Sequence, residues 1–468
     1  MSGTSLFHIS PGTRAPLDPG FVPAVLANEA YRRAVSRATD SSRLMIALER
    51  ENGLTCRADV DILGGGAELD ADTARFVERH IKFLLWAHGG WKLFMSGPGA
   101  ICDSIRRAYA AGGARAFDAD LMLKAYGRTF DVVRVAPSQM PAPREMSAAI
   151  GGHFEGCRIG FDLGASDYKV AAVIDGEEVF SKEIPWQPSV EKDPQYHYRH
   201  VLSGLKEAAA HLPRVDAIGG SSAGIWVDNQ CKVASLFRAV PGAAFTREIS
   251  PMFLHIQREW GVPLVVVNDG DVSALAGALS LKRNAILGIA MGSSLAAGYL
   301  DRKGCITGQL NELAFTPVDF NPQAAADEWS GDRGTGALYF SQQAVNKLAP
   351  AAGFAFPADR PLPERLKDVQ AKANAGDKAA LDVFVTMGVY FGYAVAHYAE
   401  YYDFDALLVL GRVTSGRGGE VIMEHARKVL REEFPGLNER IALHVPDEKS
   451  RRVGQAVAAA SLPELKPR

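Results

Sequence analysis

Two successive β-hairpins, each followed by alternating strands and helices, constrain the fold of this 468-residue chain most strongly. The first cycle opens with the strand-like runs "RIGFDLG" (158–164) and "YKVAAVI" (168–174) and continues through a helical pattern to "VDAIGGSS" (215–222). The second begins at "PLVVVNDG" (263–270) and contains the paired runs "AILGIAMG" and "AAGYLD" (285–301). This duplicated topology predicts two α/β lobes around a cleft.

Changes in composition along the chain predict its domain organisation. The first residues are rich in Pro and Gly, a small unit of alternating strands and helices follows, and a Pro/Ala/Gly-rich stretch leads into the duplicated region. The sequence leaves three roles open for the small unit: covering the active-site cleft, forming a homodimer contact, or binding a second ligand. The expected segments are an N-terminal arm (1–45), an N-terminal α/β unit (46–136), a linker (137–156), an N-terminal lobe (157–262) and a C-terminal lobe (263–462).

Charge and cysteine usage exclude several classes of function. Lys+Arg total 51 against 54 for Asp+Glu, without a basic run, so we expect no binding to nucleic acid or membranes. The five cysteines lie far apart, which favours a reduced, cytoplasmic protein without a disulfide framework. The N-terminus lacks the pattern of a signal peptide. The most apolar long segment, 381–402, carries His397 and Glu400, so we expect a buried helix rather than a membrane span.

Gly-bearing strand ends occur three times in the duplicated region. They are "DLGAS" (162–166), the turn with Gly292 and Ser293, and the Gly-rich loop that begins at Gly411. Any hairpin turn uses such residues, and taken alone the first turn fits that structural reading. However, backbone N–H groups of Gly/Ser turns can also approach phosphates, and a strand-end carboxylate can hold a divalent metal. Together, two turns that approach phosphates and a Gly-rich loop that contacts the adenine base predict a nucleotide-binding clamp.

A polar pair follows the apolar strand between the first two turns. Asn268 and Asp269 stand where that strand ends and a helix begins. A carboxylate at this place can take the proton of a substrate hydroxyl. The structural alternative for Asp269 is a helix cap, because Asp and Asn are favoured at that position.

In their order, these motifs resemble the ROK family (repressors, open reading frames, kinases) of the sugar kinase and actin-like ATPase superfamily. The resemblance covers about residues 157 to 462. The family's D-[IL]-G-G-[ST] reads "DLGAS" here, its N-D-A-N-A-A-A reads "NDGDVSA" (268–274), and its G-x-x-G-E-x-G-H reads "GQLNELAF" (308–315). Its second phosphate loop, G-T-G-x-G-G-G, reads "GSSLAAG" (292–298) and keeps only the first and last glycines. The resemblance implies a two-lobed actin-like ATPase/sugar kinase fold, ribonuclease H-like and of the α/β class, with an additional N-terminal α/β unit.

The family's zinc loop, C-x-C-G-N-R-G-C-L-E-x-Y-x-S, is altered in this chain. It reads "EWSGDRGTGALYFS" (328–341), and the positions of the four zinc ligands hold Glu328, Ser330, Thr335 and Phe315. All four ligands are lost together, so we expect the loop to fold without metal. The Glu that follows the last Cys in the family, a sugar contact, is Ala337 here.

The resemblance also implies a function and a set of site residues. The expected activity is ATP-dependent phosphorylation of a small sugar-like substrate, and the alternative is a non-catalytic sugar or nucleotide sensor. Arg238 stands where the family carries Asn. Two roles are open for it: an ordinary surface residue, or a contact to an anionic group of the substrate. The resemblance implies Asp269 as the catalytic base; Asp162 at Mg²⁺, directly or through water; Gly164, Ser166, Gly292 and Ser293 at the ATP phosphates; Gly411 at the adenosine; and Asn268, Glu312, Gly224 and Arg238 at the substrate.

Overall fold

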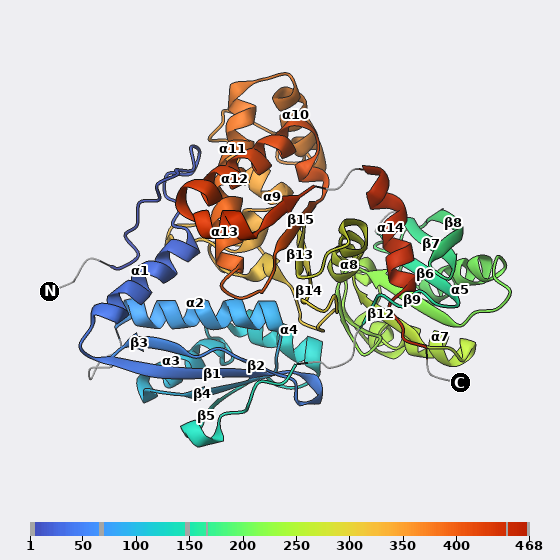
Figure 1. Cartoon of the computed structure of the whole chain (residues 1–468), viewed down its shortest axis with the longest axis horizontal. Coiled ribbons are helices and arrows are strands. Elements are labelled where there is room, and N and C mark those ends of the chain that lie inside the picture. Colours follow the sequence, from blue (N-terminus) through green and yellow to red (C-terminus); the bar gives the residue numbers. More distant parts are fainter. Residues whose placement is uncertain (1–4, 65–69, 146–149, 165–166, 446–447, 466–468) are drawn as a thin grey trace.

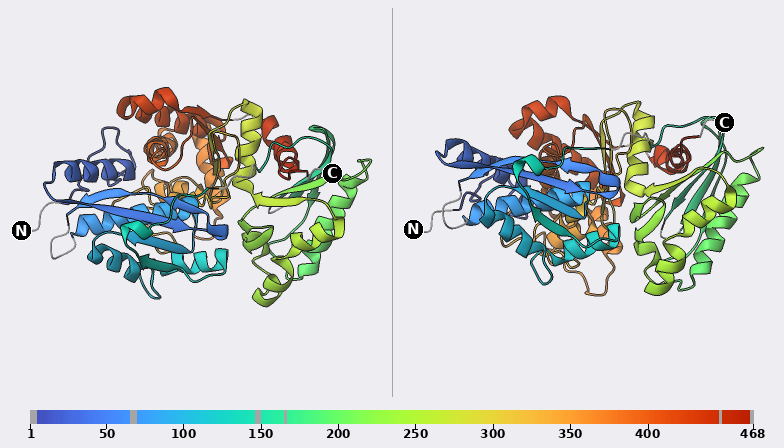
Figure 2. Two further views of the ribbon diagram at one scale, coloured as in Figure 1. Left: turned by 60° about the horizontal axis from the view of Figure 1, so that its bottom comes forward. Right: turned by 90° about the horizontal axis from the view of Figure 1, so that it is seen from below.

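The computed structural model describes residues 5–64, 70–145, 150–164, 167–445 and 448–465, with the side chains of 448–453 left aside. Three bodies make up the molecule (Figure 1). A small N-terminal unit lies beneath a C-terminal lobe, and an N-terminal lobe stands on the other side of helix α8. The further views of Figure 2 show the same arrangement from below.

A five-stranded sheet of order β12-β9-β6-β7-β8 forms the N-terminal lobe. Strands β6 to β8 are antiparallel, whereas β9 and β12 run parallel to β6. Apolar side chains of β6 such as Phe161 share one core with helices α5 and α7, as the alternation of a strand dictates. The elements are β6 (Cys157–Leu163), β7 (Asp167–Ile174), β8 (Glu177–Pro185), α5 (Pro194–Ala209), β9 (Ala217–Ser222), the hairpin β10 (Ile225–Val227) and β11 (Gln230–Val233), α7 (Met252–Trp260) and β12 (Leu264–Asn268).

The C-terminal lobe has a four-stranded sheet of order β14-β13-β15-β16. Helix α8 packs on one face of this sheet, and α11 with α12 packs on the other. The start of α8 touches β14 directly, since a Cβ on Gly298 would lie 2.1 Å from the carbonyl oxygen of Gly270. The elements are α8 (Asp269–Leu281), β13 (Ile286–Met291), β14 (Leu295–Leu300), α9 (Gln342–Leu348), α10 (Leu362–Asn374), α11 (Lys378–Tyr398), β15 (Ala406–Leu410), α12 (Gly416–Glu433), α13 (Pro435–Arg440), β16 (Ala442–His444) and α14 (Glu448–Ala460).

The structure corrects the predicted boundary between the lobes at 262/263. Strand β12 pairs with β9 and therefore belongs to the sheet of the N-terminal lobe. Helix α14 also packs on that sheet, where Gly160 and Gly219 leave room for its backbone. The reason is spatial: the chain crosses between the lobes along α8 and returns along α14, so a single cut in the sequence cannot separate them (Figure 1).

The N-terminal unit contains a five-stranded sheet in which β1 pairs with β2, β3 and β4, and β4 pairs with β5. The predicted arm (1–45) is not a separate segment. It contains helix α1, whose Tyr31 is fully buried, and the start of β1. The elements are α1 (Ala24–Arg37), β1 (Ser41–Glu49), β2 (Thr55–Arg57), β3 (Val60–Leu63), α2 (Ala71–His88), β4 (Lys92–Ser96), α3 (Gly99–Tyr109), α4 (Ala116–Tyr126) and β5 (Asp131–Arg134).

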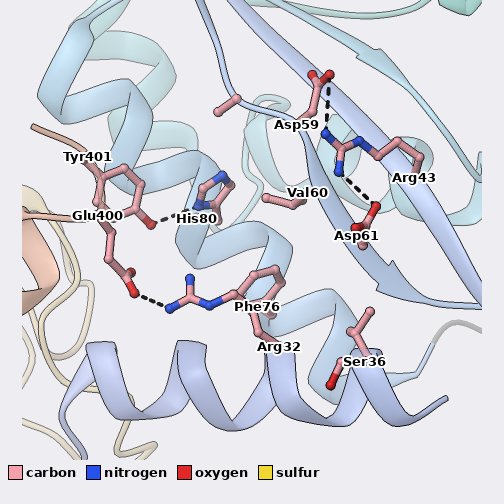
Figure 3. A pocket seen from close by; sticks show the side chains of 12 residues that line it. Arg32, Ser36, Arg43, Asp59, Val60, Asp61, Phe76, His80, Glu400 and Tyr401 are labelled. Carbon is pink, nitrogen blue, oxygen red and sulfur yellow. Dashed lines mark hydrogen bonds and ion pairs between the residues drawn. The ribbon is translucent and has the colours of Figure 1, made fainter.

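Polar contacts join the N-terminal unit to the end of α11 (Figure 3). Arg32 of α1 forms an ion pair with Glu400, and the ring of His80 in α2 lies 2.9 Å from the hydroxyl of Tyr401. These residues line a cavity of about 490 Å³ between the two bodies. Among the described residues, α11 alone is long and apolar enough to cross a membrane, and 78% of its apolar window is buried inside the protein.

Candidate active site

Asp162 lies near the end of β6, and its carboxylate is held by the neighbouring strand. Its register partner in β9 is Ser221, whose hydroxyl donates a 2.6 Å hydrogen bond to Asp162 Oδ1. Burial raises the pKa of Asp162, whereas the Ser221 hydroxyl and the charge of Lys169 oppose that rise. The site therefore offers a half-buried, hard oxygen ligand near the end of a strand, which suits a divalent cation that also binds phosphates and water.

Asp269 is the first residue of α8, and the helix cap is its neighbour. Asn268 is the N-cap: its Oδ1 accepts a 2.7 Å bond from Gly270 N, while its Nδ2 donates 2.8 Å to the carbonyl of Gly224. Burial and the nearby charge of Asp162 raise the pKa of Asp269 to about 6. The Asn268 side chain is thus the N-cap, and the pKa of the Asp269 carboxylate stays raised although the backbone N–H groups of Asp269 and Gly270 lower it.

Two further carboxyl groups accompany Asp269. Burial and the charges of Asp269 and Asp271 raise the pKa of Glu312 to about 7. Asp271 is 5% exposed, and mainly burial raises its pKa to about 7. Asp271 was not predicted from the sequence, although its place in "NDGDVSA", where the ROK motif has a second Asn, was a usable signal. These groups make the region strongly acidic.

The loop that carries Glu312 has a special backbone. Asn311 stands at the second Gly of the G-x-x-G-E motif and has φ +53°. Asparagine tolerates this left-handed region better than other side chains, so the departure from the motif keeps the turn.

The predicted phosphate turns are described only in part. Gly164 closes a tight turn, because a Cβ there would lie 2.7 Å from the carbonyl oxygen of Asp167. Ser166 lies outside the described residues. In the β13–β14 turn, a Cβ on Gly292 would meet the carbonyl oxygen of Ser294 at an ordinary 3.6 Å, and Ser293 is exposed. The β13–β14 turn is therefore accessible to an anion. Packing within this turn does not by itself require a glycine at position 292.

Gly411 and Asp269 line the same cavity of about 270 Å³. Gly411 follows β15 directly with φ +103°, and a Cβ on it would lie 2.3 Å from the carbonyl oxygen of Met291. Only glycine fits there. Ala296, at a position where the ROK loop has glycine, also lines this cavity. The structure thus brings together the predicted base and the predicted adenosine loop.

The remaining predicted substrate residues are less closely grouped. Gly224 has φ +112° and lies beside Asn268, as its hydrogen bond records. Arg238 is exposed and donates a 3.4 Å bond to the carbonyl of Ser189. This exposure and the bond to Ser189 agree with the structural reading of this arginine as a surface residue.

The altered zinc loop is stabilised by hydrogen bonds and packing. The backbone N–H and hydroxyl of Ser330 both donate to Asp327 Oδ1, at 2.7 and 2.8 Å. Phe315 packs against Trp86 of α2, with ring centroids 4.3 Å apart. Thr335 is fully buried and Glu328 is exposed. In the described part of the chain, no group of three or more His, Cys, Asp or Glu side chains could hold a metal ion.

Two sheet lobes joined by α8 and α14, with carboxylates at the strand and helix ends between them, define the sugar kinase and actin-like ATPase fold. No protein-family model and no curated protein matches the chain. Several solved structures, however, match the chain. A ROK family glucokinase from Streptomyces griseus, in complex with glucose and AMPPNP, is 20% identical with a TM-score of 0.50, and the match covers 66% of this chain and 99% of that chain.

A second similar structure is a ROK family transcriptional regulator, a homologue of the E. coli MLC protein. It is 20% identical with a TM-score of 0.51, over 66% of this chain and 79% of that chain. The chain therefore has the ROK-type fold, and the predicted fold class is confirmed. At this identity the likeness shows the fold alone, so chemistry has to be argued from the site.

Proposed function

We propose that this protein is a ROK-type kinase that transfers a phosphoryl group from ATP to a hydroxyl of a sugar-like molecule. The observation that carries the proposal is Asp269: a half-buried carboxylate next to the N-cap Asn268, whose pKa burial and the charge of Asp162 raise to about 6, in the cavity that Gly411 also lines. A general base works best when its pKa lies near the working pH.

The residues around Asp269 suit the demands of phosphoryl transfer, which are positioning and charge stabilisation. Asp269 accepts the proton of the acceptor hydroxyl as that oxygen attacks. Asp162 would hold Mg²⁺, directly or through water, and bound Mg²⁺ would neutralise phosphate charge. Of the described residues, Gly164, Gly292 and Ser293 would approach the phosphates through their backbone, and Gly411 leaves room for the adenosine.

The acceptor lies on the other side of Asp269. Glu312 is electrostatically coupled to Asp269 and is the favoured contact to a sugar hydroxyl. Asn268 acts mainly by fixing Gly224 and the start of α8, because both of its polar atoms already bind the protein. The acidic surroundings favour a neutral acceptor over a sugar acid, and Arg238 then stays at the surface.

A sugar or nucleotide sensor on the same scaffold is the second candidate. Ala296 and Ala297 replace glycines of the second phosphate loop, and Ala296 narrows the cavity beside Asp269. The similarity to a transcriptional regulator agrees with this alternative. A sensor would bind sugar or nucleotide without turnover.

The test is an assay of ADP release with Mg²⁺-ATP and a panel of monosaccharides and polyols. We expect turnover with at least one acceptor, and a loss of about a hundredfold or more in Asp269→Asn, the usual worth of a positioned general base. Asp103→Asn is the matched control, because Asp103 forms only an exposed ion pair with Arg106 on α3. Binding without turnover would favour the sensor, and full activity in Asp269→Asn would remove Asp269 from the mechanism.

A further inference from the structure

The N-terminal unit, which lies outside the ROK-like region, reaches the loop that carries Glu312. The last turn of α2 leaves backbone carbonyls without partners inside the helix. Successive amides of the loop fill these places: Leu310 N donates to His88 O at 3.3 Å, Asn311 N to Ala87 O at 2.9 Å, and Glu312 N to Trp86 O at 3.0 Å. The backbone that presents Glu312 is therefore fixed by a helix of another body.

Asn311 connects this loop to the carboxylates of α8. It is 3% exposed, and its Nδ2 donates a 2.9 Å hydrogen bond to Asp271 Oδ1. Its Oδ1 accepts a 3.1 Å bond from the hydroxyl of Tyr402. With its backbone N–H bound to Ala87, the residue links the N-terminal unit, α8 and the chain after α11.

The unit also contacts the other elements on the same side of the cleft. Arg50, buried at the end of β1, donates a 2.8 Å bond to the carbonyl of Gly308, where the loop begins. Helix α4 packs against the hairpin β10–β11, which follows Gly224 in the N-terminal lobe. In Figure 1, α4 lies at the junction of the three bodies. The N-terminal unit thus touches both lobes beside the residues assigned to the acceptor.

We propose that the N-terminal unit forms a wall of the acceptor site and that Asn311 is the positioning residue through which it fixes Glu312 and Asp271 around Asp269. This inference rests on the proposed kinase function. Without the Asn311 side chain, the buried Asp271 loses its amide partner and the loop loses its bond to Tyr402. The loop then moves relative to α8, so that acceptor binding suffers while nucleotide binding, on the other side of Asp269, does not.

The main variant is Asn311→Gly, which keeps the left-handed backbone and removes both side-chain hydrogen bonds. Its matched control is Asn52→Gly, an exposed asparagine at φ +58° in the N-terminal unit. We expect the amides of residues 310–312 to exchange with deuterium about tenfold faster in Asn311→Gly than in the wild type or the control. We also expect the acceptor KM to rise about tenfold, with the ATP KM unchanged. Should Asn311→Gly fail to fold, Tyr402→Phe keeps the volume and removes one of the two bonds.

The outcomes separate the two proposals. Wild-type exchange rates at residues 310–312, or an equal rise of both KM values, would overturn the role of Asn311. If the wild type phosphorylates no acceptor of the panel, the kinase proposal fails. In that case the exchange rates alone decide whether the N-terminal unit holds the loop.

Discussion

The ammonium group of Lys82 lies 3.0 Å from Asp332 Oδ2, and both side chains are almost completely buried. Lys82 belongs to α2 of the N-terminal unit, whereas Asp332 belongs to the loop that carries zinc ligands in the ROK family. This pair is the centre of a larger network. The other members are Arg79 at 2.9 Å and Arg115 at 2.8 Å from Asp332, Glu78 beside both arginines, and Asp118 at 3.0 Å from Lys82.

The network contains three cations (Arg79, Lys82 and Arg115) and three carboxylates (Glu78, Asp118 and Asp332), all largely buried. Although burial alone would raise the pKa of Asp332, the charges of Arg79, Lys82 and Arg115 hold that pKa well below its usual range. A buried ion pair is weak evidence for stability by itself, but breaking one is strongly destabilising. Asp332 is therefore the point where the N-terminal unit and the altered zinc loop depend on each other.

The first prediction is that Asp332→Asn destabilises the protein by about 3–5 kcal/mol, since buried cations then lack their counter-charge. Chemical denaturation, followed by circular dichroism, measures this change. Asp103→Asn, at an exposed pair, should change stability little. A variant Asp332→Asn as stable as the wild type would mean that the network does not join the two bodies.

The second prediction is that the purified protein carries no structural zinc. The loop has its own polar anchor in Asp327 and a charged partner in the N-terminal unit. Elemental analysis after dialysis should find zinc far below one atom per chain, and a chelator should leave the melting temperature unchanged. Stoichiometric zinc would reveal ligands that the sequence pattern did not indicate.

Local patterns allowed much of the two lobes to be predicted from the sequence. The strands β6, β7 and β13 are short apolar runs bounded by Gly and polar residues, and α8 begins where an apolar strand meets Asn268. Asp269 and Gly411 were predicted because each follows such a strand directly. The strands, the start of α8 and these two residues are determined by neighbours in the sequence. A local sequence pattern can therefore predict them.

The missed features depend on contacts between distant residues. Strand β1 opens with the polar residues "SSR" and was absorbed into a predicted arm. The pairing of β12 with β9 is a property of the sheet, and β12 itself gives no sign of the lobe it joins. Arg79 and Asp332 are 253 positions apart, so their pairing leaves no local pattern. The same holds for the bonds between α2 and residues 310–312.

The third prediction concerns Asp162 and nucleotide. Mg²⁺-ATP should raise the melting temperature of the wild type, because a ligand that binds the folded state stabilises it. In Asp162→Asn the amide oxygen can still accept from Ser221, but the charge is lost. A tenfold weaker Kd would lower the stabilisation by about 1.4 kcal/mol. Removing Mg²⁺ from the wild type should reduce the shift similarly, and an undiminished shift in Asp162→Asn would exclude a metal role for this carboxylate.

The fourth prediction concerns pH. The folded-state pKa of Glu312, about 7, lies above the ordinary value of 4.5, chiefly through burial and the charge of Asp269. The protonated form therefore stabilises the fold below pH 4.5, and this contribution is lost as the pH rises through 7. Glu312→Gln stays neutral, so its melting temperature should exceed that of the wild type more at about pH 8 than at about pH 5. The exposed Glu177→Gln should show no such trend.

The last prediction separates backbone strain from close packing at Gly411. Gly411→Ala places a side chain in the left-handed region, at a cost of about 1–3 kcal/mol, and also drives it into the carbonyl of Met291. Gly376 is the matched control, because it has φ +83° and no atom within 4 Å of the place where a Cβ would stand. Gly376→Ala should therefore show the strain alone and keep the ATP-dependent thermal shift. Gly411→Ala should melt lower than the control and lose that shift, since β15 must move away from β13 at the cavity shared with Asp269. Equal melting temperatures with a retained shift would place the adenosine elsewhere.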